Sequence, residues 1–195
     1  RPSGYGRRRY HARMHILAFA ASTSSRSINK QLIGYAAMCL GNGLIGADVS
    51  VDVIDINDYE MPIYSIDRQE AGGIPEPAHR FHDQIANADA LVISFAEHNG
   101  HYTAAYKNLY DWTSRIDRKV YQERPLVMLS ASPGGRGGAG VLEIAMAAAV
   151  RQGADVRAGL SVPHFNDIFD VEAGRIVNDE LDGAFRQALA TLAPG

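Results

Sequence analysis

Five predominantly apolar runs of seven or eight residues recur along the chain, at residues 15–21, 49–56, 89–96, 124–131 and 155–162. Short apolar runs bounded by polar turns are typical of strands that are covered on both faces. Between and after these runs, apolar residues return with the three- and four-residue spacing of a helix face. Helices are therefore predicted over residues 27–40, 75–87, 104–116, 141–152 and 179–192. Residues 57–74 follow neither pattern and predict a long irregular connection.

Strands that alternate with helices indicate a parallel sheet with helices on both faces, an open doubly wound α/β domain. No internal repeat and no linker divides the sequence, so residues 14–195 are expected to form one domain. In such sheets a ligand binds beyond the carboxyl ends of the strands, where the strand order reverses. The candidate ligand loops therefore follow the first, third and fourth strands, at residues 22–29, 97–103 and 132–140.

Composition and charge narrow the classes of partner. Hydrophobic residues make up 46% and charged residues 21% of the chain, which is typical of a soluble globular protein. Residues 1–13 contain five arginines and no acid, so residues 14–195 carry 14 basic and 22 acidic side chains and a formal charge of −8. This acidic body argues against nucleic acid as the main partner. We interpret residues 1–13 as a disordered basic leader before a natural start at Met14; the alternative is a basic anchor for RNA or a membrane.

The sequence contains no segment that predicts a membrane span or a secretion signal. No apolar stretch approaches transmembrane length, and the run "ILAFAA" after the arginines is too short for a signal peptide. The single cysteine, Cys39, cannot form an internal disulfide and lies in an apolar helical stretch, so we expect a buried small hydrophobe. A cytoplasmic location is the default expectation.

The stretch SASPGGRGGAG, residues 130–140, contains the spacing G-x-G-x-x-G at Gly135, Gly137 and Gly140. This spacing occurs in the phosphate loop of dinucleotide-binding folds, with a ribose-binding acid about 20 residues further on. In those folds the motif follows the first strand and the acid ends the second. Here the motif follows the fourth predicted strand and Asp155 begins the fifth. We therefore reject the dinucleotide interpretation.

A better phosphate site follows the first strand. Residues 22–27 comprise four serines, a threonine and an arginine, directly before a helix amino terminus. Hydroxyls, Arg26 and the free backbone N–H groups of a helix start all favour a phosphate group, and Asn29 is expected to tie the loop to itself. The alternative is that Ser25 or Ser27 only caps the helix. The lysine of a nucleoside triphosphate loop is absent, which argues against such a site. A hydroxyl-rich loop after the first strand of a five-stranded sheet suits a mononucleotide, in the flavodoxin-like order 2-1-3-4-5.

Three segments resemble the motifs of one family, the NADPH-dependent FMN reductases. "ASTSSRSIN" is similar to that family's phosphate loop, G-S-x-R-x-x-S-x-N. "AEHNGHYTAAYKNLYDW" is similar to its P-E-Y-N-x-x-x-x-x-x-x-K-N-x-x-D-W segment, and SASPGGRGGAG is similar to S-x-S-x-G-G-x-G-G. The resemblance covers Met14 to the carboxyl end, with the motifs after the first, third and fourth strands. It implies a flavodoxin-like three-layer sandwich, in which a five-stranded parallel sheet has helices on both faces.

The resemblance implies an FMN site with three parts. Around the phosphate it places Ser22, Ser24, Arg26, Ser27, Ile28 and Asn29. At the edge of the isoalloxazine ring it places Glu97, His98, Asn99 and Gly100. Beside the ring it places Ser132, Pro133, Gly134 and Gly135, where the two glycines would let the backbone approach closely.

The chain departs from the family pattern at four positions. Ala21 replaces the usual glycine, and Ser24 stands where the family often has arginine, while Arg26 follows two positions later. Ala96 replaces proline, and His98 replaces the common tyrosine. A ring-stacking role of that tyrosine therefore does not transfer directly, although imidazole can still stack or donate a hydrogen bond.

The implied activity is hydride transfer from NADPH or NADH through FMN to a quinone, azo, flavin or similar small-molecule acceptor, with no catalytic residue assigned because the flavin carries the chemistry. The alternatives are a flavodoxin-like electron carrier without nicotinamide turnover, and a phosphate-binding module without flavin.

Family members form oligomers through the region of residues 104–116, so the resemblance implies a homodimer or homotetramer. The alternative is that residues 104–116 are an amphipathic helix packed on the sheet. His98 and His101 have no third ligand nearby, so no metal is expected. His79 and His82 share their spacing and are expected on an exposed helix face.

Overall fold

A parallel sheet of five strands occupies the centre of the structure, a computed structural model that describes residues 13–194. The strands are β1 (Met14–Ala21), β2 (Val49–Asp55), β3 (Ala90–Phe95), β4 (Pro125–Ala131) and β5 (Asp155–Val162). Their order is β2-β1-β3-β4-β5, and every pairing between them is parallel. The predicted flavodoxin-like order is therefore confirmed. The predicted leader, except for Arg13, lies outside the described residues.

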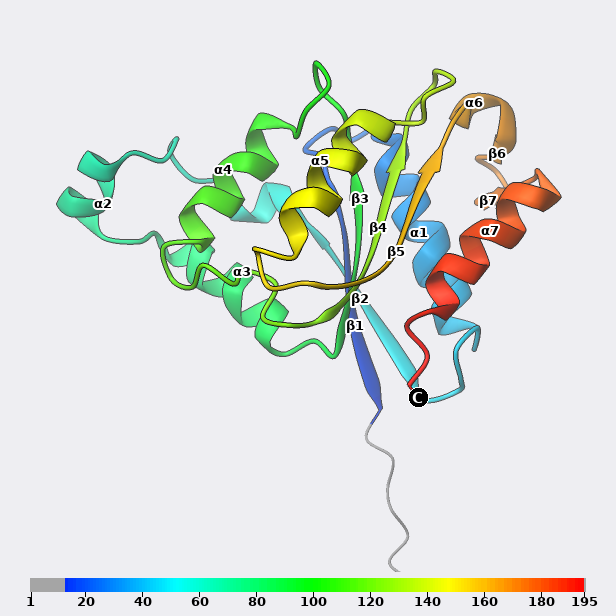
Figure 1. The fold of residues 1–195 in the computed structure, drawn as a ribbon, viewed down its shortest axis with the longest axis horizontal. Coiled ribbons are helices and arrows are strands. Elements are labelled where there is room, and N and C mark those ends of the chain that lie inside the picture. The colour runs from blue at the N-terminus through cyan, green and yellow to red at the C-terminus, as the bar shows by residue number, and fades with distance from the viewer. Residues whose placement is uncertain (1–12, 195) are drawn as a thin grey trace, which may run out of the picture.

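Helices cover both faces of the sheet (Figure 1). Helices α3 (Glu76–Ala86), α4 (Ala104–Thr113) and α5 (Ala139–Ala149) lie on one face, and α1 (Ile28–Gly41) and α7 (Asp179–Ala190) lie on the other. Because side chains alternate along a strand, β1 contributes Leu17 and Phe19 to the first core and Ile16 and Ala18 to the second, all fully buried. This two-sided burial is the reason why the central strands are continuous apolar runs.

Five short elements are absent from the sequence-based prediction, two of them before β3 and three after β5. The connection predicted to be irregular, residues 57–74, contains the end of a 3₁₀ helix (Ile56–Tyr59) and the helix α2 (Ile66–Gly72), which projects from the rest of the molecule in Figure 1. Helix α2 buries no residue and is held by its cap, since Ser65 Oγ accepts a hydrogen bond from the amide of Arg68. A segment without a buried face has no apolar periodicity, so the pattern could not predict it.

The segment after β5 is also more regular than predicted. It forms the one-turn helix α6 (Phe165–Ile168) and a hairpin of β6 (Phe169–Asp170) and β7 (Arg175–Ile176). Cys39 is buried on α1, in agreement with the sequence, and burial raises the pKa of its thiol. Within residues 13–194, no helix combines the length and the apolar character that crossing a bilayer requires.

Candidate functional site

Three loops meet at the carboxyl edge of the sheet, the upper edge in Figure 1. Asn29 joins two of them, since its amide Nδ2 donates to Ala131 O (3.2 Å) and its Oδ1 accepts from Ala131 N (3.0 Å) and from Ser94 Oγ (2.7 Å). Thr103 joins the third, because its hydroxyl donates to Ala21 O (3.0 Å). The prediction that Asn29 ties its own loop together is wrong: this buried side chain ties the start of α1 to β3 and β4.

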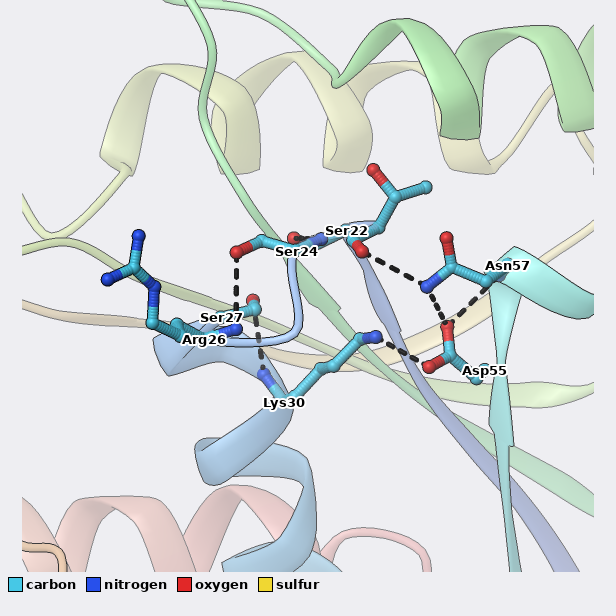
Figure 2. A network of polar contacts seen from close by, with 8 residues as sticks. Ser22, Ser24, Arg26, Ser27, Lys30, Asp55 and Asn57 are labelled. Carbon is cyan, nitrogen blue, oxygen red and sulfur yellow. Dashed lines mark hydrogen bonds and ion pairs between the residues drawn. The ribbon is translucent and has the colours of Figure 1, made fainter.

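The loop between β1 and α1 keeps its serine hydroxyl protons available. Ser22 Oγ accepts from the amide of Ser24 (3.3 Å), Ser24 Oγ accepts from the amide of Arg26 (3.2 Å), and Ser27 Oγ accepts from the amide of Lys30 (3.4 Å), as Figure 2 shows. A hydroxyl that accepts a hydrogen bond still carries one proton to donate. Three O–H donors on one short loop are well suited to the oxygens of a phosphate group.

The amino terminus of α1 adds further attraction for an anion. The helix begins at Ile28 with Ser27 as its N-cap, and its first turn contains no acidic residue. The first amides of a helix, here those of Ile28 and Asn29, lack a partner within the helix and lie at the positive end of its dipole. Arg26 is exposed, and its guanidinium forms no ion pair with any residue in the 13–194 range.

A polar network at the end of β2 anchors this loop. Lys30 Nζ forms an ion pair with Asp55 Oδ2 (2.6 Å), while Asn57 Nδ2 donates to Asp55 Oδ1 (2.9 Å) and to Thr23 O (3.0 Å), as drawn in Figure 2. Burial disfavours the charged carboxylate of Asp55, but the hydrogen bonds from Lys30 and Asn57 outweigh it and lower its pKa. This network was not predicted, although the polar residues that directly follow the second apolar run were a signal.

The loop after β3 is a tight hairpin. The amides and carbonyls of His98 and His101 pair in both directions (3.0 and 3.1 Å), and the two residues between them, Asn99 (φ 53°) and Gly100 (φ 76°), have left-handed backbones. Asn-Gly with positive φ at both positions is the preferred two-residue hairpin turn. All four residues are exposed, so the turn presents them at the upper edge of the sheet.

Glu97 caps a helix on a neighbouring loop. Its Oε1 accepts a hydrogen bond from the amide of Val141 (3.0 Å) at the start of α5, whose own N-cap, Gly138, supplies no side chain. The carboxylate therefore occupies the positive end of α5, and this helix start is not a free phosphate site. This geometry supports the rejection of the dinucleotide interpretation for the glycine loop.

The glycines of residues 134–140 serve mainly to pack the loop. A Cβ on Gly137 (φ 59°) would lie 2.7 Å from Pro163 N, and a Cβ on Gly140 would lie 2.4 Å from Glu97 Oε1. A Cβ on Gly135 would meet the His164 ring at 3.2 Å, whereas at Gly134 the nearest atom, Ser132 Oγ, is 4.0 Å away. Close packing against β5 and Glu97 thus explains Gly137 and Gly140, whereas Gly134 borders open space.

The family is identified by comparison with known proteins. A family model described as NADPH-dependent FMN reductase matches residues 14–167. The chain belongs to this family. The matched segment contains all three loops and every strand of the central sheet.

Two curated relatives are similar over part of their length. An NAD(P)H-dependent FMN reductase of Pseudomonas aeruginosa is 33% identical over 119 residues, which are 61% of this chain and 60% of the relative. A 2-hydroxy-1,4-benzoquinone reductase of a Burkholderia species is 34% identical over 125 residues, which are 64% of this chain and 63% of the relative. The alignments thus span less than two thirds of either relative.

Solved structures share the fold of this FMN reductase family member over nearly the whole chain. FerB, a flavoenzyme NAD(P)H:(acceptor) oxidoreductase from Paracoccus denitrificans, has a TM-score of 0.74 at 18% identity and covers 92% of this chain and 95% of its own. An FMN-dependent NADH-azoreductase from Bacillus anthracis in complex with FMN has a TM-score of 0.66 at 14% identity and covers 93% and 100%. At this identity the likeness concerns the fold alone.

The loop after β5 brings a further residue to the glycine loop of this family member. The amide of His164 donates to Gly134 O (3.1 Å), its backbone is left-handed (φ 50°), and its ring lies beside Gly135. The rule about carboxyl ends could have indicated this residue, since Pro163 and His164 directly follow the fifth apolar run. The described part of the chain contains no group of three or more histidine, cysteine or carboxylate side chains that could hold a metal ion.

Proposed function

We propose that the loop of residues 22–29 binds the phosphate of FMN. Its donors fit a phosphate: the hydroxyls of Ser22, Ser24 and Ser27, the amides of Ile28 and Asn29, and the guanidinium of Arg26. Charge-assisted hydrogen bonds of this kind are about twice as strong as neutral ones. The three hydroxyls that accept from the backbone while keeping their protons are the observation that carries this proposal.

The isoalloxazine ring would then lie between the two neighbouring loops. One side consists of the half-buried Glu97 and the exposed His98, Asn99 and Gly100, and the other of Ser132, Pro133, Gly134 and Gly135. The backbone of Gly134 is accessible to a ligand, because the atom nearest to an added Cβ, Ser132 Oγ, is 4.0 Å away. Exposed backbone amides there would stabilise negative charge on the pyrimidine end of a reduced ring.

We further propose that the protein passes a hydride from NADPH or NADH through FMN to a quinone-type or related small-molecule acceptor. Bound FMN supplies the redox chemistry, and the residues of the chain bind and orient it. The names of the two curated relatives, an FMN reductase and a benzoquinone reductase, support this substrate class. The proposal includes a cytoplasmic location and a homodimer or homotetramer.

Three measurements test the function. An absorbance titration with FMN should give saturable binding, and anaerobic NADPH or NADH should then bleach the flavin band. With a quinone as acceptor, double-reciprocal plots should be parallel, because one shared site requires the oxidised nicotinamide to leave before the acceptor enters. Binding of FMN without bleaching by either nicotinamide would instead favour an electron carrier, and absence of FMN binding would overturn the whole proposal.

A further inference from the structure

A cavity lies at the carboxyl ends of α4 and α5, away from the candidate flavin site. Its volume is about 440 Å³, and its polar lining includes Tyr110, Asp111, Arg115, Arg118, Arg151 and Gln152. Helix α4 has ten residues and starts directly after the hairpin of residues 98–101. The lining begins at Tyr110, six residues after the start of the helix, so at 1.5 Å per residue about 9 Å of helix separate the cavity from that hairpin. The cavity is therefore not part of the site described above.

The charge of this cavity is positive and uncompensated. None of its three arginines forms an ion pair with a carboxylate within residues 13–194, although the body of the chain is acidic overall. The one acid of the lining, Asp111, is already paired with Lys107, whose Nζ lies 2.7 and 2.8 Å from its two carboxylate oxygens. Three exposed arginines thus line one cavity, and none of them has a carboxylate partner among the described residues.

Several contacts hold the lining in place. Arg115 donates to Ser114 Oγ (3.2 Å), and its guanidinium carbon lies 5.4 Å from the centroid of the Tyr64 ring, a cation–π arrangement. Burial raises the pKa of the Tyr110 hydroxyl, while the charges of Arg115 and Arg151 act on that hydroxyl in the opposite direction. Gln152 Oε1 in the lining is buried without a hydrogen-bond partner.

Cations also favour helix carboxyl termini, where the dipole is negative. That effect accounts for a basic residue after each helix, since Arg115 and Arg118 follow α4 and Arg151 follows α5. It does not account for a shared cavity whose volume falls within the usual range for small-molecule sites, about 300–1,000 Å³. The convergence of both helix ends on one cavity is the feature that indicates a ligand.

We propose that this cavity binds the diphosphate group of a small molecule. Guanidinium groups bind phosphate oxygens in a bidentate manner, and two adjacent phosphates can engage Arg115, Arg118 and Arg151 together. Tyr110 and Gln152 add neutral polar groups at the wall. This inference does not depend on the proposed flavin chemistry, because none of these residues belongs to the three loops at the carboxyl edge.

Calorimetric titration of the full chain with inorganic pyrophosphate, at fixed ionic strength and with saturating FMN to occupy the loop at α1, tests the proposal. We expect saturable binding that is tighter than that of orthophosphate or sulfate. The double substitution Arg118→Gln with Arg151→Gln should weaken it at least tenfold, which corresponds to about 1.4 kcal/mol. Arg175→Gln removes an exposed arginine on β7 and serves as the control, with unchanged affinity expected.

A second variant keeps the test decisive if the glutamine variant unfolds. Arg118→Lys with Arg151→Lys retains both charges but removes the bidentate fork, so its pyrophosphate affinity should be lower than that of the wild type, and unchanged affinity would contradict the bidentate contacts. No saturable binding to the wild type would overturn the proposal. The proposal would also be overturned if the wild type and the glutamine variant bound pyrophosphate equally well. It would likewise be overturned if Arg175→Gln lost as much pyrophosphate affinity as the glutamine variant, because binding would then follow net charge or another site.

Discussion

At Ser27, capping a helix and binding a phosphate are compatible roles for one hydroxyl. Its oxygen accepts from the amide of Lys30 and thereby caps α1. The hydroxyl proton is not used by that bond, so it remains a donor for a ligand. The sequence alone posed capping and ligand binding as alternatives for this residue, whereas the geometry allows both at the same time.

Substitutions at Ser27 can separate the two roles. Asp and Asn are as good as Ser at an N-cap, so Ser27→Asp and Ser27→Asn should both unfold near the wild-type urea midpoint. The aspartate, however, places a negative charge next to the proposed phosphate, and like charges a few ångströms apart in a partly screened site repel by several kcal/mol. We expect FMN affinity to fall about 100-fold in Ser27→Asp and less than tenfold in Ser27→Asn. Wild-type FMN affinity in Ser27→Asp would place the phosphate elsewhere.

Gly137 is the glycine that the backbone requires most. Its φ of 59° and the 2.7 Å between an added Cβ and Pro163 N mean that alanine would be strained and would collide with the main chain of the segment after β5. Gly137→Ala should lower the free energy of unfolding by about 2–4 kcal/mol, the sum of a left-handed backbone and overpacking. Gly134→Ala is the matched control and should change it by less than about 0.5 kcal/mol. Urea unfolding curves measure both, and equal losses would contradict this account.

At the scale of elements, the cap of α5 comes from outside the helix. Glu97 bonds the amide of Val141 and so links the loop after β3 to the helix after β4. Glu97→Gln removes the charge at the positive helix end but retains an acceptor, and we expect a loss of about 0.5–1 kcal/mol in the free energy of unfolding. Glu143→Gln, an exposed position on the same helix, removes the same charge without a capping contact and should have a smaller effect. A larger loss in Glu143→Gln would contradict the capping role.

The central elements could be predicted because burial leaves a pattern in the sequence. Strands β1, β3 and β4 are covered on both faces, and their apolar runs indicated the extent of the strands and a parallel sheet. Helix α2 and the hairpin β6–β7 could not be found this way, because capping and turn contacts form them rather than a buried face. The loops of the site were predictable from the carboxyl-end rule, but their cross-links were not: Asn29 bonds Ala131, which lies 102 residues away.

At the scale of the whole molecule, the sheet itself places the candidate site. Strands β1, β3 and β4 end at the same edge, so the loops that follow them meet although they are far apart in the sequence. Figure 1 shows α1 and α5 on opposite faces of the sheet, both starting near that edge. The start of α1 is free of acids, whereas Glu97 occupies the start of α5. This asymmetry favours an anion at α1 over one at α5 and supports the proposal that the phosphate binds at residues 22–29 rather than in the glycine loop.

The opposite edge of the sheet contains a titratable contact that should make stability depend on pH. The ring of His15, at the start of β1, bonds Asn87 O (3.0 Å) and Asp52 Oδ2 (2.9 Å), and Asp89 is nearby. The hydrogen bond to the Asn87 carbonyl and the charges of Asp52 and Asp89 outweigh burial and raise the pKa of His15. Because the folded state prefers the protonated ring, this contribution is fully present below the unfolded value of about 6.5 and is lost as the pH rises through the folded pKa.

We therefore expect wild-type protein to exceed His15→Gln in free energy of unfolding by more at pH 5.5 than at pH 8.5. The contact is partly exposed, with 25% of the His15 side chain and 63% of the Asp52 side chain accessible, so the difference between the two pH values should be at most about 1 kcal/mol. Urea unfolding at both pH values measures it, and subtracting the variant cancels the titration of all other groups. His79→Gln, at an exposed position of α3, is the control and should show no such dependence. A wild-type advantage that grows towards pH 8.5 would contradict the protonated contact at the start of β1.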